Sequence, residues 1–137
     1  MLVDFIFHHI GVAVKDIDKT SAIYEVAGYD MSDIIFDPIQ NVNIRWLTKE
    51  GMPTIELLTP VDETSPDSKI LEKNGVTPYH MCYVVGDIDN AVVELRKQKY
   101  VLVSKPVEAI AMHNCKVAFL YNRHIGLIEL VEAPANI

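Results

Sequence analysis

A set of one histidine and one glutamate, two residue types that bind metal ions, occurs twice in this chain of 137 residues. Each occurrence places one histidine and one glutamate in a stretch that otherwise has the composition of a buried β-strand. The four residues are His9, Glu56, His80 and Glu129. Two imidazole nitrogens and two carboxylate oxygens suit Ni, Co, Zn, Mn or Fe, whereas Ca prefers oxygen ligands alone. The pattern predicts a metal site at a pseudo-twofold axis between two halves of the chain.

An internal duplication relates the two occurrences. The segment FHHIGVAVKDIDKT returns as PYHMCYVVGDIDNA, which aligns His9 with His80. The segment TIELLTP returns as LIELVEA, which aligns Glu56 with Glu129. A single histidine or glutamate in a strand is usually hydrogen-bonded in the core or exposed to solvent. Four such residues in register across a duplication favour the metal interpretation.

The alternation of strand residues predicts which side of each strand carries these donors. In the first strand His9 shares a face with Gly11 and Ala13, two small residues that leave room for a site. Glu56 and Glu129 are each flanked by bulky apolar residues, so both carboxylates are expected on the cavity side. Two partly buried carboxylates repel each other, and a divalent cation balances both charges.

These donors require strands that a tandem repeat can supply. We expect an α+β fold in one domain, residues 1–137, built from two βαβββ modules. Module one covers about 5–59, a polar connector 60–76, and module two about 77–132. The expected strands are 5–14, 30–36, 42–48, 54–59, 78–85, 101–104, 115–121 and 126–132, with helices after Asp16 or Asp18, at 68–73 and at 87–99. Ile88, Ala91, Val92 and Leu95 form one apolar stripe on the last helix.

Composition narrows the class of ligand. The net charge of −7 comes without any basic run, which argues against nucleic acid and anionic membranes as partners. The apolar opening lacks the basic start of a signal peptide and is too short to span a membrane, so a cytoplasmic protein is expected. Cys82 and Cys115 are expected to be buried thiols. A small-molecule substrate and a homodimer are expected.

The chain resembles the vicinal oxygen chelate superfamily, whose paired βαβββ modules form a cupped half-barrel. The segments TPYHMCYVV and KVAFLYNRHIGLIELVE particularly resemble short bacterial proteins of the glyoxalase I type. This resemblance implies that His9, Glu56, His80 and Glu129 bind the metal. It also implies a lactoylglutathione lyase-like activity, in which a proton moves next to a carbonyl through a metal-stabilised enediolate of a 2-oxoaldehyde hemithioacetal. Glu129 is expected as the principal base and acid, with Glu56 sharing both duties.

Three alternatives stay open within the same resemblance. Methylmalonyl-CoA epimerase shares the chemistry, but the chain has Pro78 and Tyr79 before His80 in place of an HHI segment, and no third cavity carboxylate was found on the strand 43–46. A non-catalytic protein of the bleomycin-resistance kind generally lacks the complete donor set. A ring-cleaving dioxygenase normally uses two histidines and one carboxylate on iron. The thiol, the native metal, the identity of the base and the sharing of the site across a dimer stay undecided.

Four further residues have weaker patterns. Arg45 and Arg123 are candidates for binding a substrate carboxylate, since glutathione recognition would favour arginine. Trp46 is expected to pack in the core, and His8 is expected to be a packed histidine.

Overall fold

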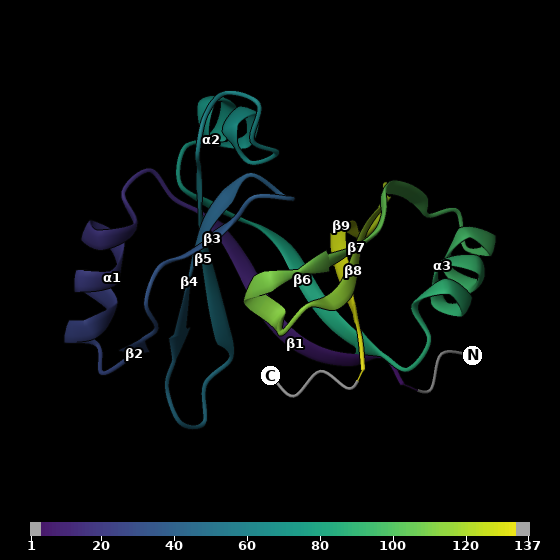
Figure 1. The fold of residues 1–137 in the computed structure, drawn as a ribbon, viewed down its shortest axis with the longest axis horizontal. Helices are drawn as coiled ribbons and strands as arrows, with labels where there is room; N and C mark the ends of the chain where they lie inside the picture. Colours follow the sequence, from purple (N-terminus) through teal and green to yellow (C-terminus); the bar gives the residue numbers. More distant parts are fainter. Residues whose placement is uncertain (1–3, 134–137) are drawn as a thin grey trace. The chain divides into compact units, whose positions relative to one another are not determined.

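The computed structural model describes residues 4–133, and these fall into two compact units. Unit 2 comprises His9–Tyr79, and unit 1 comprises the described residues up to His8 together with those from His80 onward. Each unit combines strands with helices (Figure 1), which confirms the predicted α+β class. The ends of the expected domain, residues 1–3 and 134–137, lie outside the described residues. That residues 1–137 form one domain stays a prediction.

Unit 2 follows the predicted βαβββ plan, with one predicted strand divided in two. Its elements are β1 (Ile6–Ala13, which begins in unit 1), α1 (Ile17–Val26), β2 (Asp30–Met31), β3 (Ile35–Asp37), β4 (Val42–Thr48), β5 (Thr54–Pro60) and α2 (Ser68–Asn74). The strand order is β2-β4-β5-β1, and β3 also pairs with β4. Strand β1 is parallel to β5, whereas β4 is antiparallel to β2, β3 and β5.

The predicted strand 30–36 is interrupted at Ser32, and the hydrogen bonds explain the break. The amide of Ser32 donates to the carbonyl of Trp46, but the amide of Trp46 donates back to the Ser32 hydroxyl at 3.0 Å. A side-chain oxygen therefore replaces the backbone carbonyl in the ladder, which ends β2 and lets β3 start anew.

Helix α1 is held by its cap and by a narrow contact with the sheet. The Asp16 carboxylate accepts a hydrogen bond from the Lys19 amide at 3.0 Å, as predicted for an N-cap. Only Ile17 and Ser21 are buried along the helix. The core beneath it is the cluster Val14, Ile17, Leu47 and Leu57.

Unit 1 repeats the plan. Its elements are β6 (Thr77–Val85, which begins in unit 2), α3 (Ile88–Lys97), β7 (Val101–Ala109), a 3₁₀ turn (Ile110–Met112), β8 (Cys115–Asn122) and β9 (Gly126–Glu132). The strand order is β6-β9-β8-β7, with β6 parallel to β9 and the other pairs antiparallel. Strand β7 runs past its predicted end at 104. The pairing of β7 with β8 shifts register between Leu102 and Val107, and Pro106 lies in this irregular stretch. A proline lacks the amide proton of a regular ladder and is tolerated at such irregularities.

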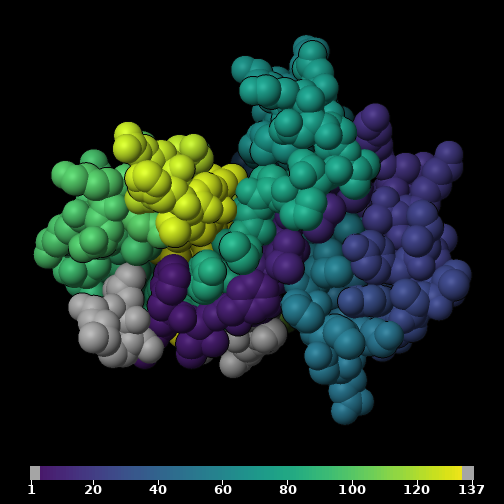
Figure 2. Space-filling view, turned by 180° about the vertical axis from the view of Figure 1, so that it is seen from behind, coloured from purple at the N-terminus to yellow at the C-terminus, as the bar shows by residue number. Residues whose placement is uncertain are grey.

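Helix α3 covers the sheet of unit 1 with the predicted stripe. Ile88, Ala91, Val92 and Leu95 are its buried residues and join the strand residues of the core. Figure 2 shows the helix, in green, beside the yellow C-terminal strands. Within residues 4–133, no helix is long and apolar enough to cross a membrane. Of the two thiols, Cys82 is buried as predicted and Cys115 is half-buried.

Candidate metal centre

The first pair of predicted ligands meets inside unit 2. His9 Nε2 lies 3.2 Å from Glu56 Oε1, and the two side chains are 0% and 4% exposed. Strand register explains the contact: β1 and β5 pair in parallel, and Gly11 lies opposite Glu56. Because Gly11 has no side chain, the imidazole of His9, two residues earlier on the same face, can reach the carboxylate.

The second pair repeats this arrangement inside unit 1. His80 Nε2 lies 3.3 Å from Glu129 Oε1, with side chains 0% and 3% exposed. Here β6 pairs in parallel with β9, and the small residue Cys82 lies opposite Glu129. The duplication seen in the sequence therefore holds for the geometry of each pair.

An aromatic ring completes each pair, and the sequence analysis missed this feature. Trp46 lies opposite Glu56 in the β4–β5 ladder, and its ring meets His9 edge-on at 4.9 Å between centroids. Phe119 lies opposite Glu129 in the β8–β9 ladder and meets His80 edge-on at 5.3 Å. The expectation of Trp46 as a core residue is wrong, since it faces the side of Glu56. The alternation of Arg45 and Trp46 left both facings open, and only the ladder register decides between them.

The electrostatics of each pair favour a cation. A carboxylate as buried as Glu56 or Glu129 is costly unless it pairs with a positive charge or binds a metal. Histidine supplies either an imidazolium or a neutral nitrogen ligand. Both residue types are therefore chemically suited to hold a divalent ion.

The distances within each pair also pass a test of fit. Nitrogen and oxygen donors at about 2.1 Å from one ion lie about 3.0 to 3.4 Å apart for angles from octahedral to tetrahedral. The two separations, 3.2 and 3.3 Å, fall within that interval. Each unit thus presents two donors spaced as neighbouring ligands of one ion.

Arg45 belongs to the opposite face of its sheet. It lies opposite Leu57 in the β4–β5 ladder, one residue out of phase with Glu56. Its guanidinium donates to the carbonyl of Ser32 at 2.9 Å and to Asp18 Oδ1 at 3.1 Å. These bonds tie α1 to the sheet, so Arg45 has a structural role and is not directed at the Glu56 side.

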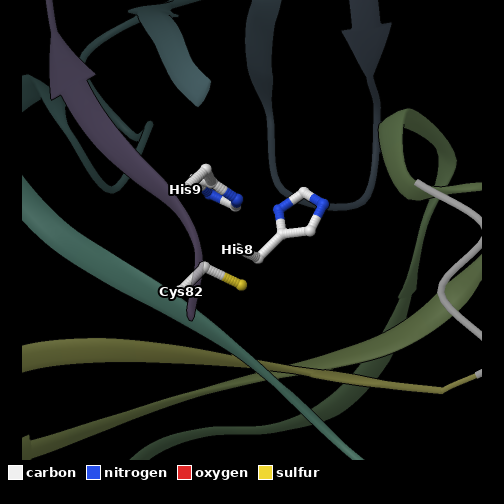
Figure 3. Close-up of side chains that lie close together, drawn as sticks. All are labelled: His8, His9 and Cys82. Carbon is white, nitrogen blue, oxygen red and sulfur yellow. The ribbon is translucent and has the colours of Figure 1, made fainter. Parts of the chain in front are cut away.

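A second combination of potential ligands was not expected. His8 is half-buried, and its ligand atom lies within 4.8 Å of the Cys82 thiol in unit 1. Figure 3 shows His8 and Cys82 with the neighbouring His9. Cys82 was predicted only as a buried thiol, not as a ligand. The signal available was its position two residues after His80, on the same face of β6.

The family of the chain follows from comparison with known proteins. Residues 8–119 match the model of the glyoxalase/bleomycin resistance protein/dioxygenase superfamily, and the chain belongs to this superfamily.

Within it, the four relatives and structures described next are epimerases. The chain is 32% identical to human mitochondrial methylmalonyl-CoA epimerase over 130 residues, which cover 92% of this chain and 73% of that protein. It is 30% identical to the ethylmalonyl-CoA/methylmalonyl-CoA epimerase of Cereibacter sphaeroides over 129 residues, which cover 90% of this chain and 94% of that protein. The crystal structure of methylmalonyl-CoA epimerase from Mycobacterium tuberculosis superposes with a TM-score of 0.83 at 27% identity, covering 96% and 91%. The structure of a methylmalonyl-CoA epimerase in complex with methylmalonyl-CoA and NH4+ superposes with a TM-score of 0.82 at 26% sequence identity, and the match covers 98% of each chain.

These findings correct the predicted activity. The expectation of a glyoxalase I lyase, similar to lactoylglutathione lyase, is wrong, because the relatives are epimerases, the class kept as the alternative. The error has a physical origin: both reactions move a proton next to a carbonyl, so His9, Glu56, His80 and Glu129 do not distinguish them. The missing HHI segment and the lack of a carboxylate on β4 therefore do not separate this chain from its epimerase relatives.

Proposed function

We propose that this protein is an epimerase that inverts the stereocentre of a methylmalonyl-CoA-like acyl-CoA. The repeated buried pair of histidine and glutamate, His9 with Glu56 and His80 with Glu129, supports proton transfer next to a carbonyl, and the relatives carry the choice of an epimerase. The named activity of the relatives, and the neighbour solved with methylmalonyl-CoA, support the substrate class. A carbon between a thioester carbonyl and a carboxylate carries an acidic proton, so its removal and return can invert the centre.

We further propose that the two pairs bind the same divalent cation. Each of His9, Glu56, His80 and Glu129 offers one ligand atom and is buried. One cation balances both carboxylates, and neutral imidazoles complete a set suited to Ni, Co or Zn, with Mn or Fe also compatible. When bound, the cation stabilises negative charge that develops on the substrate as the proton leaves.

The two glutamates divide the proton transfer in this proposal. Glu129 removes the proton from one face of the substrate carbon, and Glu56 returns a proton to the other face. The duplication supports this division, because it provides one carboxylate from each unit. Trp46 and Phe119 lie beside the pairs and exclude water from them.

A test in heavy water addresses the activity directly. Purified protein is incubated with one epimer of methylmalonyl-CoA in D2O, and the product is followed by NMR and chiral chromatography. Inversion with incorporation of one deuterium at the acidic carbon is expected. The glutathione hemithioacetal of methylglyoxal, assayed in parallel, is expected to stay unconverted. Lack of inversion by metal-loaded protein would overturn the proposal.

We also propose that the protein works as a cytoplasmic homodimer. Exposed apolar residues of unit 1 support self-association, with Ile6 62%, Phe7 41% and Met81 42% exposed. Two cysteines that form no disulfide with each other are consistent with a reducing compartment. Analytical ultracentrifugation is expected to give twice the mass of the chain, and a monomer at micromolar concentration contradicts the dimer.

A further inference from the structure

A pocket opens in unit 1 where the end of α3 meets the turn between β8 and β9. Its volume is about 530 Å³. We name it the α3–β8 pocket, and it is lined by Gln98, Lys99, Val101, Tyr121, Asn122, Arg123 and His124. None of these residues belongs to the two pairs of histidine and glutamate.

The charge of the pocket differs from that of the chain. The protein has 19 acidic residues against 12 basic ones, yet the lining contains Lys99, Arg123 and His124 and no acidic residue. Arg123 Nε donates to His124 Nε2 at 3.2 Å. Because Nε2 accepts this bond, a neutral His124 carries its proton on Nδ1. This N–H group is a hydrogen-bond donor for a ligand, in addition to those of the Arg123 guanidinium. The lining is suited to an anion.

Hydrogen bonds fix the two segments that carry these charges. Asn122 is buried, and its Nδ2 donates to the carbonyl of Gln98 at 3.1 Å. Its Oδ1 accepts from the amide of His124 at 2.8 Å. A single side chain therefore ties the end of α3 to the β8–β9 turn.

The backbone at Lys99 supplies an independent observation. Lys99 has φ of 71°, in the left-handed region where glycine is the least strained residue. Its amide donates to the carbonyl of Arg96 at 3.1 Å, which closes the end of α3. A long cationic side chain at a position that favours glycine is explained if the ammonium group binds a ligand.

The pocket also has an apolar part, formed by Val101 and Tyr121. Val101 and Tyr121 face each other in the β7–β8 ladder, and they are 63% and 47% exposed. An exposed phenol ring beside an aliphatic side chain offers a surface for stacking an aromatic ring. Cations on one side and a ring on the other match a phosphate joined to a nucleobase.

We infer that the α3–β8 pocket binds the phosphate and base of an adenine nucleotide, with phosphate against Lys99 and Arg123 and base against Tyr121. The same chemistry occurs in free ADP and in the nucleotide end of coenzyme A. The inference does not rest on the proposed epimerase function, because nucleotide binding is measured without turnover.

Calorimetric titration of the full chain with ADP tests the inference. The double variant K99Q/R123Q removes two positive charges from the lining. The control K73Q/K116Q removes two exposed lysine charges elsewhere. We expect the affinity for ADP to fall about tenfold or more in K99Q/R123Q and to stay within about twofold in the control. In NMR spectra ADP is expected to shift the signals of His124 and not those of His113.

Further titrations distinguish the two sources of the nucleotide. If coenzyme A displaces ADP and K99Q/R123Q raises KM for the acyl-CoA without changing kcat, the pocket holds the nucleotide end of the substrate. If coenzyme A does not displace ADP, the pocket binds a free nucleotide. Either result supports the inference. Equal ADP affinity in both double variants, or no binding of ADP and coenzyme A up to about 1 mM, overturns it.

Discussion

At the scale of single residues, the protein combines one histidine, one glutamate and one aromatic ring, and it does so twice. His9, Glu56 and Trp46 form one combination in unit 2. The sequence predicted the polar members because their types and register repeat. It did not predict the rings, since Trp46 and Phe119 differ in type and belong to strands whose facing depends on hydrogen-bond register. Mutagenesis of the histidines and glutamates tests their proposed roles in proton transfer and metal binding.

Replacement of Glu129 by glutamine tests its role in proton transfer. The variant E129Q keeps the shape of the side chain and loses the basic oxygen. We expect kcat for epimerisation of methylmalonyl-CoA to fall about a hundredfold or more. The control E108Q changes an exposed glutamate on β7 and is expected to keep full activity. An E129Q variant with the kcat of the wild type would show that Glu129 is not the base.

Asp67 gives a prediction about stability. It precedes α2, is completely buried, and neither of its carboxylate oxygens accepts a hydrogen bond from another described residue. Burial raises the pKa of Asp67 to about 6 from 3.8. Because the folded state holds the proton more tightly than the unfolded state, stability falls as the pH rises from about 4 to 6.

The variant D67N removes this charge while keeping the shape. We expect it to raise the free energy of unfolding at pH 7.5 by about 1 to 2 kcal/mol. The gain should vanish below about pH 4, where Asp67 is protonated in both states. Urea unfolding at both pH values measures the difference. D33N at an exposed site matches the change in net charge, and an equal, pH-independent effect in both variants would contradict the assignment.

At the scale of elements, the helices and strands show what a sequence can determine by itself. The stripe of α3 and an N-cap for α1 at Asp16 or Asp18 were predictable because they depend on residues a few positions apart, and the cap is at Asp16. The irregularities of the strands were not predictable from the sequence. Ser32 interrupts the predicted strand 30–36 through a hydrogen bond with Trp46, and β7 continues past Pro106 because it stays paired with β8. Such features depend on partners distant in the sequence.

The N-cap of α3 gives a prediction at this scale. Asp87 Oδ1 accepts a hydrogen bond from the amide of Asn90 at 3.0 Å. We expect D87A to lower the free energy of unfolding by about 1 kcal/mol, because an amide of the first turn loses its partner. D89A removes an equal charge from the same turn without breaking this bond. Loss of the same size in both variants, measured by urea unfolding, would refute the capping role.

At the scale of the whole molecule, the duplication provides one donor pair from each unit. The sequence predicted the α+β class, the repeated plan and the composition of each pair. The predicted lyase reaction was wrong, because donors that move a proton next to a carbonyl do not by themselves select the substrate, and the relatives are epimerases. Similarity to known epimerases supplied the substrate class.

Metal stoichiometry tests most directly the claim that His9, Glu56, His80 and Glu129 bind one ion. Native mass spectrometry and elemental analysis are applied to the wild type, H9A and H80A after loading with Ni, Co or Zn and removal of excess metal. The account predicts one ion per chain in the wild type and loss of that ion in either variant, each confirmed as folded by circular dichroism. Two ions per chain, or an ion retained in H9A or in H80A, would contradict it.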